Sequence, residues 1–357
     1  MRLFYLFLLA GLFFPGPTTA QSKPALSWYK TVKGTIGAYP VTLHLHKQDT
    51  AYSGCYYYES QQDPIIFNGT ALRGDSIRLY AHAGDGEETG GTFLFRWKEG
   101  RATGTWEKEG SGKLQPFQAQ EAGADSLLRF DYVYTTGSRA LRPKWRDSPA
   151  GSYEAAAVWP VDSTGPALFV RQVISQAFGE KKAGRGIGAA LLKQKRAFLD
   201  EYAREHAKVT DKELKEYGTA YTYESMESVQ VQYLSPRLLT LVHHNYSYTG
   251  GAHGNYGAGY TVIDLQKGKV LELKDVLTPE SIRALPRLLE KHFRKSYGVK
   301  EGESLSEAGL FENKIEPNDN FYLTGKGILF SYQPYEIGPY VMGQIEVFIP
   351  FAELQLK

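Results

Sequence analysis

Short runs in which apolar and polar residues alternate fill the sequence from about Thr35 to Gln120, and Gly, Asp and Asn separate these runs. In residues 41–46 every second side chain is apolar, which is the pattern of a strand with one buried face. Each run has about 4 to 8 residues, and turn residues recur about every 8 to 12 positions, as in all-β domains. The sequence therefore predicts an antiparallel β-meander, either a barrel or a sandwich, as an all-β domain over residues 24–121.

The second half of the chain has a different period. Apolar residues follow helical spacing at about 169–178, 189–217 and 279–297. Strand-like runs lie between and after these stretches, the last ones at 321–323, 327–332 and 344–350. This order of elements predicts an α+β fold in which helices pack on antiparallel sheets.

The segment 122–152 separates the two halves. Its alternation is weak, and it holds two prolines and a group of basic residues, namely Arg139, Arg142, Lys144 and Arg146. Asp147 and the flanking acidic residues dilute that charge, so we expect a solvated linker rather than a polyanion-binding patch.

Composition narrows the functional classes. The 41 basic and 39 acidic residues give a net charge of +2, so no overall charge favours binding to nucleic acid. Hydrophobic residues make up 42% of the chain and charged residues 22%, which is typical of folded globular proteins. Cys55 is the only cysteine, so an intramolecular disulfide is excluded, and its place in a strand-like run predicts a small buried hydrophobe.

The N-terminus has the pattern of a cleavable signal peptide over residues 1–20. Arg2 precedes an apolar run from Leu3 to Phe14, and Pro15-Gly16-Pro17 then precedes small residues ending at Ala20. The run is shorter than the roughly 20 apolar residues of a spanning helix. We therefore expect cleavage near Ala20 and a secreted or periplasmic protein that keeps no membrane anchor after cleavage.

His44 and His46 are candidates for a metal site because they lie two apart on one strand face. Val41, Leu43 and Leu45 supply the apolar face of the same strand, which would place both histidines outside. A zinc site needs three or four ligands, and the sequence fixes no further ligand nearby. We therefore expect solvated histidines and predict no metal and no cofactor.

The most distinctive segment is residues 246–254, Tyr-Ser-Tyr-Thr-Gly-Gly-Ala-His-Gly. Its glycines allow a tight turn or a close backbone approach. We interpret five of its residues as a structural turn motif: Tyr248, Gly250, Gly251, His253 and Gly254. A hairpin-like segment follows at 260–273, and the runs 321–324 and 332–340 are the other two individual motifs.

These three motifs, in this order, resemble a bacterial family. It comprises the extracytoplasmic regions of lysozyme-sensing anti-sigma factors and the non-catalytic N-terminal modules of peptidoglycan deacetylases. The similarity covers residues of about 153–354. It implies two small α+β units, near 153–235 and 236–354, and a binding role outside the membrane, with lysozyme as the ligand of the sensors.

The chain departs from both groups in that family. Unlike the sensors, it lacks a cytoplasmic sigma-binding segment and an internal membrane anchor, so direct signalling is not expected. Unlike the deacetylases, it lacks the Thr-Phe-Asp-Asp-Gly-Pro setting and the pair of histidines four apart that would bind zinc. Nucleophile-elbow and phosphate-loop patterns are absent as well, so we predict a protein that is not an enzyme.

The loop from Tyr332 to Tyr340 is the candidate binding site. Its tyrosines are amphipathic, and its prolines lower the entropic cost of ordering the loop on binding. The resemblance places partner contacts in this region, and the ligand-binding candidates are Tyr332, Gln333, Pro334, Tyr335, Glu336 and Tyr340. The alternative interpretation is that these aromatic residues pack beneath a sheet.

Three functions remain open from the sequence. The first is an exported binding protein for a cell-wall-related ligand, which is lysozyme, another muramidase or a peptidoglycan fragment. The second is a cell-wall carbohydrate or peptide hydrolase that uses Glu336 together with His253 as acid and base. The third is an envelope scaffold protein whose N-terminal β domain contacts a partner.

Overall fold

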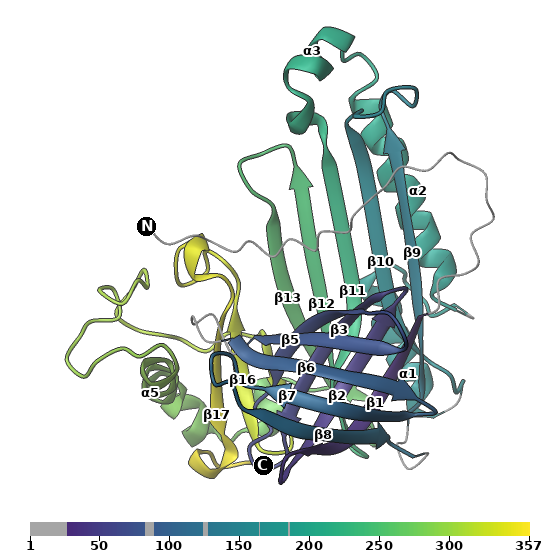
Figure 1. The fold of residues 1–357 in the computed structure, drawn as a ribbon. Coiled ribbons are helices and arrows are strands. Elements are labelled where there is room, and N and C mark those ends of the chain that lie inside the picture. The colour runs from purple at the N-terminus through teal and green to yellow at the C-terminus, as the bar shows by residue number, and fades with distance from the viewer. Residues whose placement is uncertain (1–26, 83–88, 124–127, 164, 185) are drawn as a thin grey trace.

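A computed structural model describes residues 27–82, 89–123, 128–163, 165–184 and 186–357. The expected signal peptide at residues 1–20 lies outside the described residues. The chain is α+β: a closed β-barrel packs against one face of a large mixed sheet, and a smaller unit with its own sheet follows (Figure 1). Among the described residues, no helix has the length and apolarity needed to cross a membrane.

The N-terminal domain is a barrel rather than a sandwich, because β1 pairs with both β2 and β8. Its interior is filled by alternate side chains of all the strands, and Tyr56, Phe93 and Phe117 stack edge to face at its centre. In order, its strands are β1 (Ser27–Ile36), β2 (Tyr39–Gln48), β3 (Ala51–Tyr58), β4 (Ile65–Ala71), β5 (Ser76–His82), β6 (Thr89–Lys98), β7 (Arg101–Glu107) and β8 (Leu114–Glu121).

The large sheet follows the barrel. It has the strand order β14-β13-β12-β11-β10-β9, and it runs without a break through the expected boundary between units at residue 235. Its strands are β9 (Phe130–Ala140), β10 (Ala150–Pro160), β11 (Tyr223–Leu234), β12 (Leu238–Thr249), β13 (Asn255–Asp264) and β14 (Lys269–Val270). The pair β10–β11 is parallel, in contrast to the expected antiparallel sheets, because three helices form the crossover between these strands.

The expected linker contains a strand. β9 pairs with β10 along its whole length, from Phe130 opposite Pro160 to Ala140 opposite Ala150. Two of the four basic residues that suggested a solvated connector bind acidic side chains of the helices, whereas Lys144 and Arg146 are exposed. Arg139 lies 2.7 Å from a carboxylate oxygen of Asp200, and Arg142 lies 2.7 Å from one of Asp211. Ion pairs to the neighbouring helices therefore account for half of this charge cluster.

Helices cover the face of the large sheet that is opposite the barrel. α1 (Pro166–Ala177) and α2 (Gly188–Glu205) pack on it, with Tyr153 of β10 donating its hydroxyl hydrogen to Gln194 at 3.1 Å. The single helix expected at 189–217 is divided, because Thr210 caps a new helix, α3 (Asp211–Glu216). A 3₁₀ turn, η1 (Gly218–Tyr221), leads into β11.

The C-terminal unit packs one helix on a three-stranded sheet, beside β13 (Figure 1). The last three strands occur where the sequence predicts them, and Pro286 lies inside α5. The elements are α4 (Leu273–Val276), α5 (Pro279–Ser296), β15 (Phe321–Leu323), β16 (Gly327–Tyr332), η2 (Tyr340–Met342), β17 (Ile345–Pro350) and η3 (Phe351–Glu353).

The prediction that His44 and His46 are solvated is wrong. They do point out of the barrel, but the large sheet covers that side of the barrel, and their exposed fractions are 0% and 1%. His46 Nε2 accepts a hydrogen bond from the backbone N–H of Val231 at 3.1 Å, and His44 Nδ1 lies 2.8 Å from the Tyr29 hydroxyl. Alternation identified the outer face of the strand but not what covers it.

Cys55 lies in the same contact between barrel and sheet, which confirms it as a small buried side chain. Its thiol donates to the backbone oxygen of Gln232 at 3.2 Å. Burial raises the pKa of this thiol far above its usual value. Cys55 therefore packs as a structural residue.

Candidate functional site

Two segments that lie far apart in the sequence meet beside β13. The first is the turn between β12 and β13, and the second is the loop that follows β16. The Tyr340 hydroxyl donates to the backbone oxygen of Gly254 at 2.7 Å, and the rings of His253 and Tyr340 stack with centroids 4.1 Å apart. The turn motif and the binding-loop candidates therefore form one site.

Further aromatic rings surround this stack. The rings of Tyr256 and Tyr335 each lie 5.6 Å from that of Tyr340. The exposed fractions are 36% for Tyr256 and 56% for Tyr335. We call the group Tyr246, His253, Tyr256, Tyr335 and Tyr340 the tyrosine surface.

Glycines allow the backbone to approach this closely. A Cβ on Gly254 would lie 2.4 Å from the ring of Tyr246, so only glycine lets that ring pack here. Gly250 has φ +81°, and a Cβ there would lie 2.0 Å from the backbone oxygen of Ala220. The turn motif therefore holds the hairpin against η1 on one side and against Tyr246 on the other. Tyr248 and Gly251 lie in the same hairpin, at its β12 end and in its turn.

Hydrogen bonds fix the second segment. The Gln333 side chain accepts from the N–H of Ala258 at 3.2 Å and donates to its backbone oxygen at 2.7 Å. The Glu336 carboxylate accepts from the backbone N–H of Gln333 and from the amide of Asn318, both at 2.8 Å. Gln333 and Glu336 thus position the loop, which holds Tyr335 at φ +70° with its ring in solvent.

Tyr332 is not available to a ligand. Its exposed fraction is 1%, and its hydroxyl donates to the backbone oxygen of Glu316 at 2.7 Å. Burial raises the pKa of this hydroxyl, because the phenolate would lose its hydration. For Tyr332 the packing alternative is therefore correct. Pro334 is half-buried and shapes the loop beside it.

The polar groups of the catalytic alternative have structural partners. His253 Nδ1 donates to the backbone oxygen of Gly254 at 3.0 Å, which stabilises the turn. Glu336 makes the two contacts described above. Partial burial and the neighbouring Tyr335 raise the pKa of the Tyr340 hydroxyl, so this group is a neutral hydrogen-bonding phenol at neutral pH. The arrangement is suited to contact through aromatic rings.

The sequence-based choice of site residues missed Tyr246 and Tyr256. These two residues are directly opposite one another in the β12–β13 hairpin. Each of them is the same number of residues away from Gly251, so a hairpin centred on that glycine pairs the two tyrosines. The sequence could therefore have identified both residues, but only if the strand register had been used together with the turn motif.

Among the described residues, no group of three or more His, Cys, Asp or Glu side chains has the geometry of a metal site. His44 and His46 lie in the contact between barrel and sheet, and His243 and His244 point to opposite faces of β12, as the alternation predicts. His243 packs against Phe178 beneath the helices. The carboxylate nearest to it, that of Glu227, lies 4.0 Å away.

Two family models match parts of the chain. Residues 172–256 match the model described as deacetylase PdaC, and residues 274–352 match DUF3298, described as a protein of unknown function. The two matches divide the tyrosine surface: Tyr246 and His253 lie in the first and Tyr335 and Tyr340 in the second. No curated protein matches the chain.

Two solved structures of DUF3298 family proteins are similar to part of this chain. A protein from Bacteroides fragilis is 27% identical, with a TM-score of 0.58 over 65% of this chain and 94% of its own. A protein from Pseudomonas aeruginosa is 19% identical, with a TM-score of 0.47 over 66% of this chain and 97% of its own. The chain therefore carries a segment that is similar to the PdaC model, followed by a segment that is similar to DUF3298, and the tyrosine surface forms where the two meet.

Proposed function

We propose that this chain is an exported binding protein that recognises a cell-wall-related ligand through the tyrosine surface, and that its partner is lysozyme or another muramidase. The matches to the PdaC and DUF3298 models, together with the resemblance to extracytoplasmic lysozyme-sensing modules, support a cell-wall-related role outside the membrane. The same resemblance and the signal-peptide pattern support export.

One observation carries the proposal. The two motifs that carry the resemblance come together as an aromatic surface on a fixed backbone. Exposed tyrosines held by a rigid loop bury a large area on binding at a small cost in conformational entropy, and Tyr is enriched among the residues that dominate interface energies. Tyr335, with more than half of its side chain exposed, is the central contact residue.

The surroundings of the surface favour a basic partner. Glu336 is exposed next to Tyr335, and Glu224 lies near the hydroxyl of Tyr246, whose pKa burial and that carboxylate raise. Lysozyme is a basic protein, so these carboxylates would complement its charge. The chain as a whole has a net charge of only +2, so complementarity must come from this local surface.

Isothermal titration calorimetry of the mature chain with lysozyme tests the proposal. We expect saturable binding by the wild type and binding about 30-fold weaker in Tyr335→Ala, because loss of a central tyrosine costs about 2 kcal/mol or more. Tyr39→Ala is the matched control, since Tyr39 is 67% exposed but lies on the barrel. It should bind as the wild type does.

Three results would contradict the proposal that this surface binds lysozyme. Absence of binding to lysozymes, with binding to purified muropeptides that Tyr335→Ala weakens, would make peptidoglycan fragments the ligand of this surface. No binding to either would remove the binding role. Cleavage of purified peptidoglycan by the wild type but not by Glu336→Gln would favour the hydrolase alternative.

A further inference from the structure

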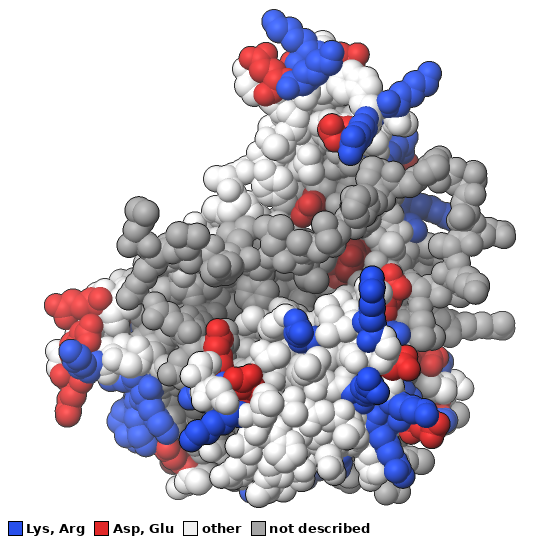
Figure 2. All heavy atoms as spheres, in the orientation of Figure 1, with Lys and Arg blue, Asp and Glu red and all other residues white. Residues whose placement is uncertain are grey.

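One side of the barrel's outer wall is covered by the large sheet, and the other side is open to solvent. The strands β1–β3 pack against the large sheet, whereas β4–β8 turn a second wall to solvent (Figure 1). In Figure 2 the middle of this second wall is uncharged, and charged side chains lie toward its edges. Three large side chains are exposed on it: Tyr80 at 43%, Leu94 at 42% and Leu114 at 64%. Each of these three side chains is therefore partly accessible to a ligand.

Strand register aligns the outward residues of this wall in one row. Asn68 is opposite Tyr80, Tyr80 is opposite Thr92, Thr92 is opposite Glu107, and Glu107 is opposite Leu114. Adjacent strands lie about 4.8 Å apart, so a row across five strands spans roughly 19 Å. We call this row, together with His82 and Glu109, the barrel groove. Its length suits an extended ligand better than a single small molecule.

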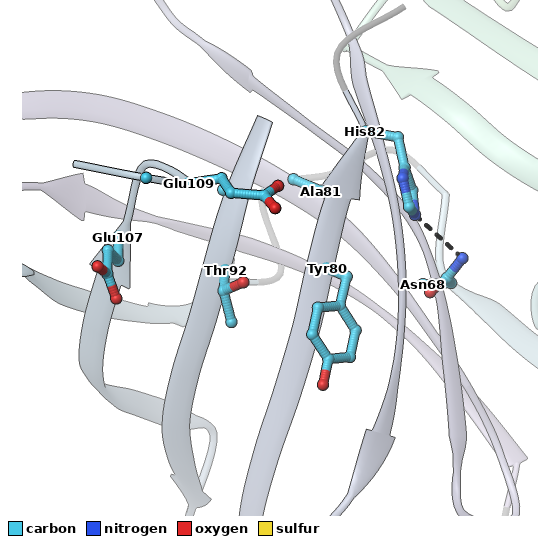
Figure 3. A pocket seen from close by; sticks show the side chains of 9 residues that line it. Asn68, Tyr80, Ala81, His82, Thr92, Glu107 and Glu109 are labelled. Carbon is cyan, nitrogen blue, oxygen red and sulfur yellow. Dashed lines mark hydrogen bonds between the residues drawn. The ribbon is translucent and has the colours of Figure 1, made fainter. Parts of the chain in front are cut away.

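The row is hollowed along its length. A hollow of about 450 Å³ lies between Asn68, Tyr80, His82 and Glu109, and one of about 280 Å³ lies toward Leu114. Both are lined by Tyr80, Thr92 and Glu107, so the two are continuous. Figure 3 shows the first hollow: the side chains come from neighbouring strands, and Glu109 reaches over the end of β6 toward β5.

A β-bulge shapes the upper end of the groove. The register of β5 against β6 shifts between Ala81 and His82. The His82 ring lies beside Asn68, with Nε2 3.2 Å from the amide nitrogen (Figure 3). Gly91, opposite Ala81, has φ +129°, and a Cβ there would lie 2.6 Å from the backbone oxygen of Glu107. Bulges that re-aim a side chain are common beside binding sites.

We propose that the barrel groove binds an extended saccharide. Tyr80 offers an aromatic face for the apolar side of a sugar ring, and the Leu114 side chain extends that apolar strip. The carboxylates of Glu107 and Glu109 accept hydrogen bonds from ring hydroxyls, and the amide of Asn68 both donates and accepts. Arg78 lines the second hollow as well, with its guanidinium 3.5 Å from the Tyr80 hydroxyl, so groups of both charges and an amide surround one exposed aromatic ring. Such a mixture of hydrogen-bond donors and acceptors suits a neutral polyol.

This site is separate from the tyrosine surface. The groove lies within residues 68–114, whereas the two family-model matches begin at residue 172. The proposal does not rest on the function of the tyrosine surface. It gives the barrel a role as a glycan-binding module next to a protein-binding module.

Calorimetric titration of the mature chain with the β-1,4-linked tetramer of N-acetylglucosamine tests the proposal. We expect saturable binding by the wild type, binding at least 10-fold weaker in Tyr80→Ala, and binding about 5-fold weaker in the isosteric Glu107→Gln. Tyr335→Ala is the matched control and should bind the sugar as the wild type does. Circular dichroism of each variant verifies its fold, and both substituted side chains are on the outer face of the barrel, away from its core.

Several results would overturn the proposal. One is absence of binding to the tetramer and to glycan strands released from peptidoglycan at millimolar concentration. Another is wild-type affinity in both Tyr80→Ala and Glu107→Gln. Binding of the sugar that Tyr335→Ala abolishes would assign it to the tyrosine surface, and binding of a lysine-rich peptide alone would show an acidic patch without sugar specificity. Failure of the lysozyme titration leaves these expectations unchanged.

Discussion

Two clusters of tyrosine and histidine in the described residues differ in how far their rings are exposed. The sealed cluster, made of Tyr29, His44, His46, Tyr57 and Tyr132, lies between the barrel and the large sheet, and each of these side chains is at most 6% exposed. The tyrosine surface has the same residue types and similar ring contacts, with Tyr29 and His46 4.8 Å apart in one and His253 and Tyr340 4.1 Å apart in the other. A second sheet covers the first cluster, whereas the second keeps exposed rings.

The difference shows how context decides the role of such residues. In the sealed cluster one nitrogen of each imidazole has a partner, which is the Tyr29 hydroxyl for His44 and the Val231 N–H of β11 for His46. The other nitrogens, His44 Nε2 and His46 Nδ1, are buried with no hydrogen-bond partner among the described residues. Burial also lowers the pKa of His44 to about 3, because a charged imidazole would lose its hydration. On the tyrosine surface the polar atoms fix the backbone and leave ring faces exposed. The first arrangement serves stability and the second serves contact.

The largest expected effect separates the clusters by stability. Tyr29→Ala removes a ring that packs on both His44 and His46, and it leaves His44 Nδ1 without the tyrosine hydroxyl. We expect a loss of about 3 to 5 kcal/mol in the free energy of unfolding, measured by urea denaturation. The exposed Tyr39→Ala should cost under about 1 kcal/mol. Similar losses in both variants would contradict the description of a sealed cluster.

The second effect is a pH dependence to which His44 and His46 of the sealed cluster contribute, together with His244 of β12. Burial lowers the pKa values of several histidines, and it does so most strongly for these three: to about 3 for His44, to about 4 for His244, and well below the usual value for His46. Below pH 6.5 these histidines bind protons in the unfolded chain but not in the folded chain. Their contribution to the free energy of unfolding is therefore complete above pH 6.5 and decreases as the pH drops. Each histidine should account for about 2 kcal/mol between pH 6.5 and 4.5.

Carboxyl groups oppose this trend, because burial raises the pKa values of Glu346, Asp63, Glu154 and Glu227. Burial raises the pKa of Glu346 to about 7. Between about pH 4.5 and 7 the folded chain keeps this proton and the unfolded chain has lost it, so the free energy of unfolding falls as the pH rises through this range and increases again on acidification. Glu346 alone offsets about one histidine, and Asp63, whose pKa is raised to about 6, acts in the same direction.

A histidine variant is therefore needed to isolate the histidine part of the pH dependence. Urea midpoints between pH 7.5 and 4.5 measure this dependence. In His46→Gln, which keeps an acceptor for Val231, the histidine part should be smaller, and an unchanged slope would contradict the assignment.

A smaller effect is expected where the backbone supports the tyrosine surface. Gln333→Ala removes both hydrogen bonds to Ala258, which should cost about 1 to 2 kcal/mol in unfolding free energy. It should also weaken ligand binding, because the loop that presents Tyr335 loses its anchor. Gln61→Ala, at an exposed position on the barrel, is the control for both measurements. Weakened binding in the control, or full binding by Gln333→Ala, would show that the anchor plays no part.

Local patterns in the sequence were sufficient for much of the fold. Alternation predicted the barrel strands, and helical spacing predicted α1 and α5, because both periods depend only on which face of an element is buried. β9 was missed although Phe130 and Tyr132 alternate with polar neighbours, since the nearby basic cluster favoured a linker. The partners of that cluster, Asp200 and Asp211, become visible only in three dimensions.

The residues of the candidate site were predictable only in part, because their contacts with one another form only in the folded structure. Glycine and tyrosine motifs identified both segments, but nothing in the sequence showed that Tyr340 stacks on His253 or that Tyr332 points into the core. In residues 332–340 the chain leaves the strand, so the alternation that assigns faces no longer applies. Which tyrosines are exposed depends on tertiary contacts such as those of Gln333.

Hydrogen–deuterium exchange of the mature chain, measured with and without lysozyme, tests whether the tyrosine surface binds lysozyme. We expect lysozyme to slow exchange in the β12–β13 turn at residues 250–258 and in the loop at residues 332–342, and to leave exchange in the barrel strands unchanged. Tyr335→Ala should remove most of this protection. Protection confined to the barrel, or equal protection in Tyr335→Ala, would contradict the assignment of the tyrosine surface as the binding site.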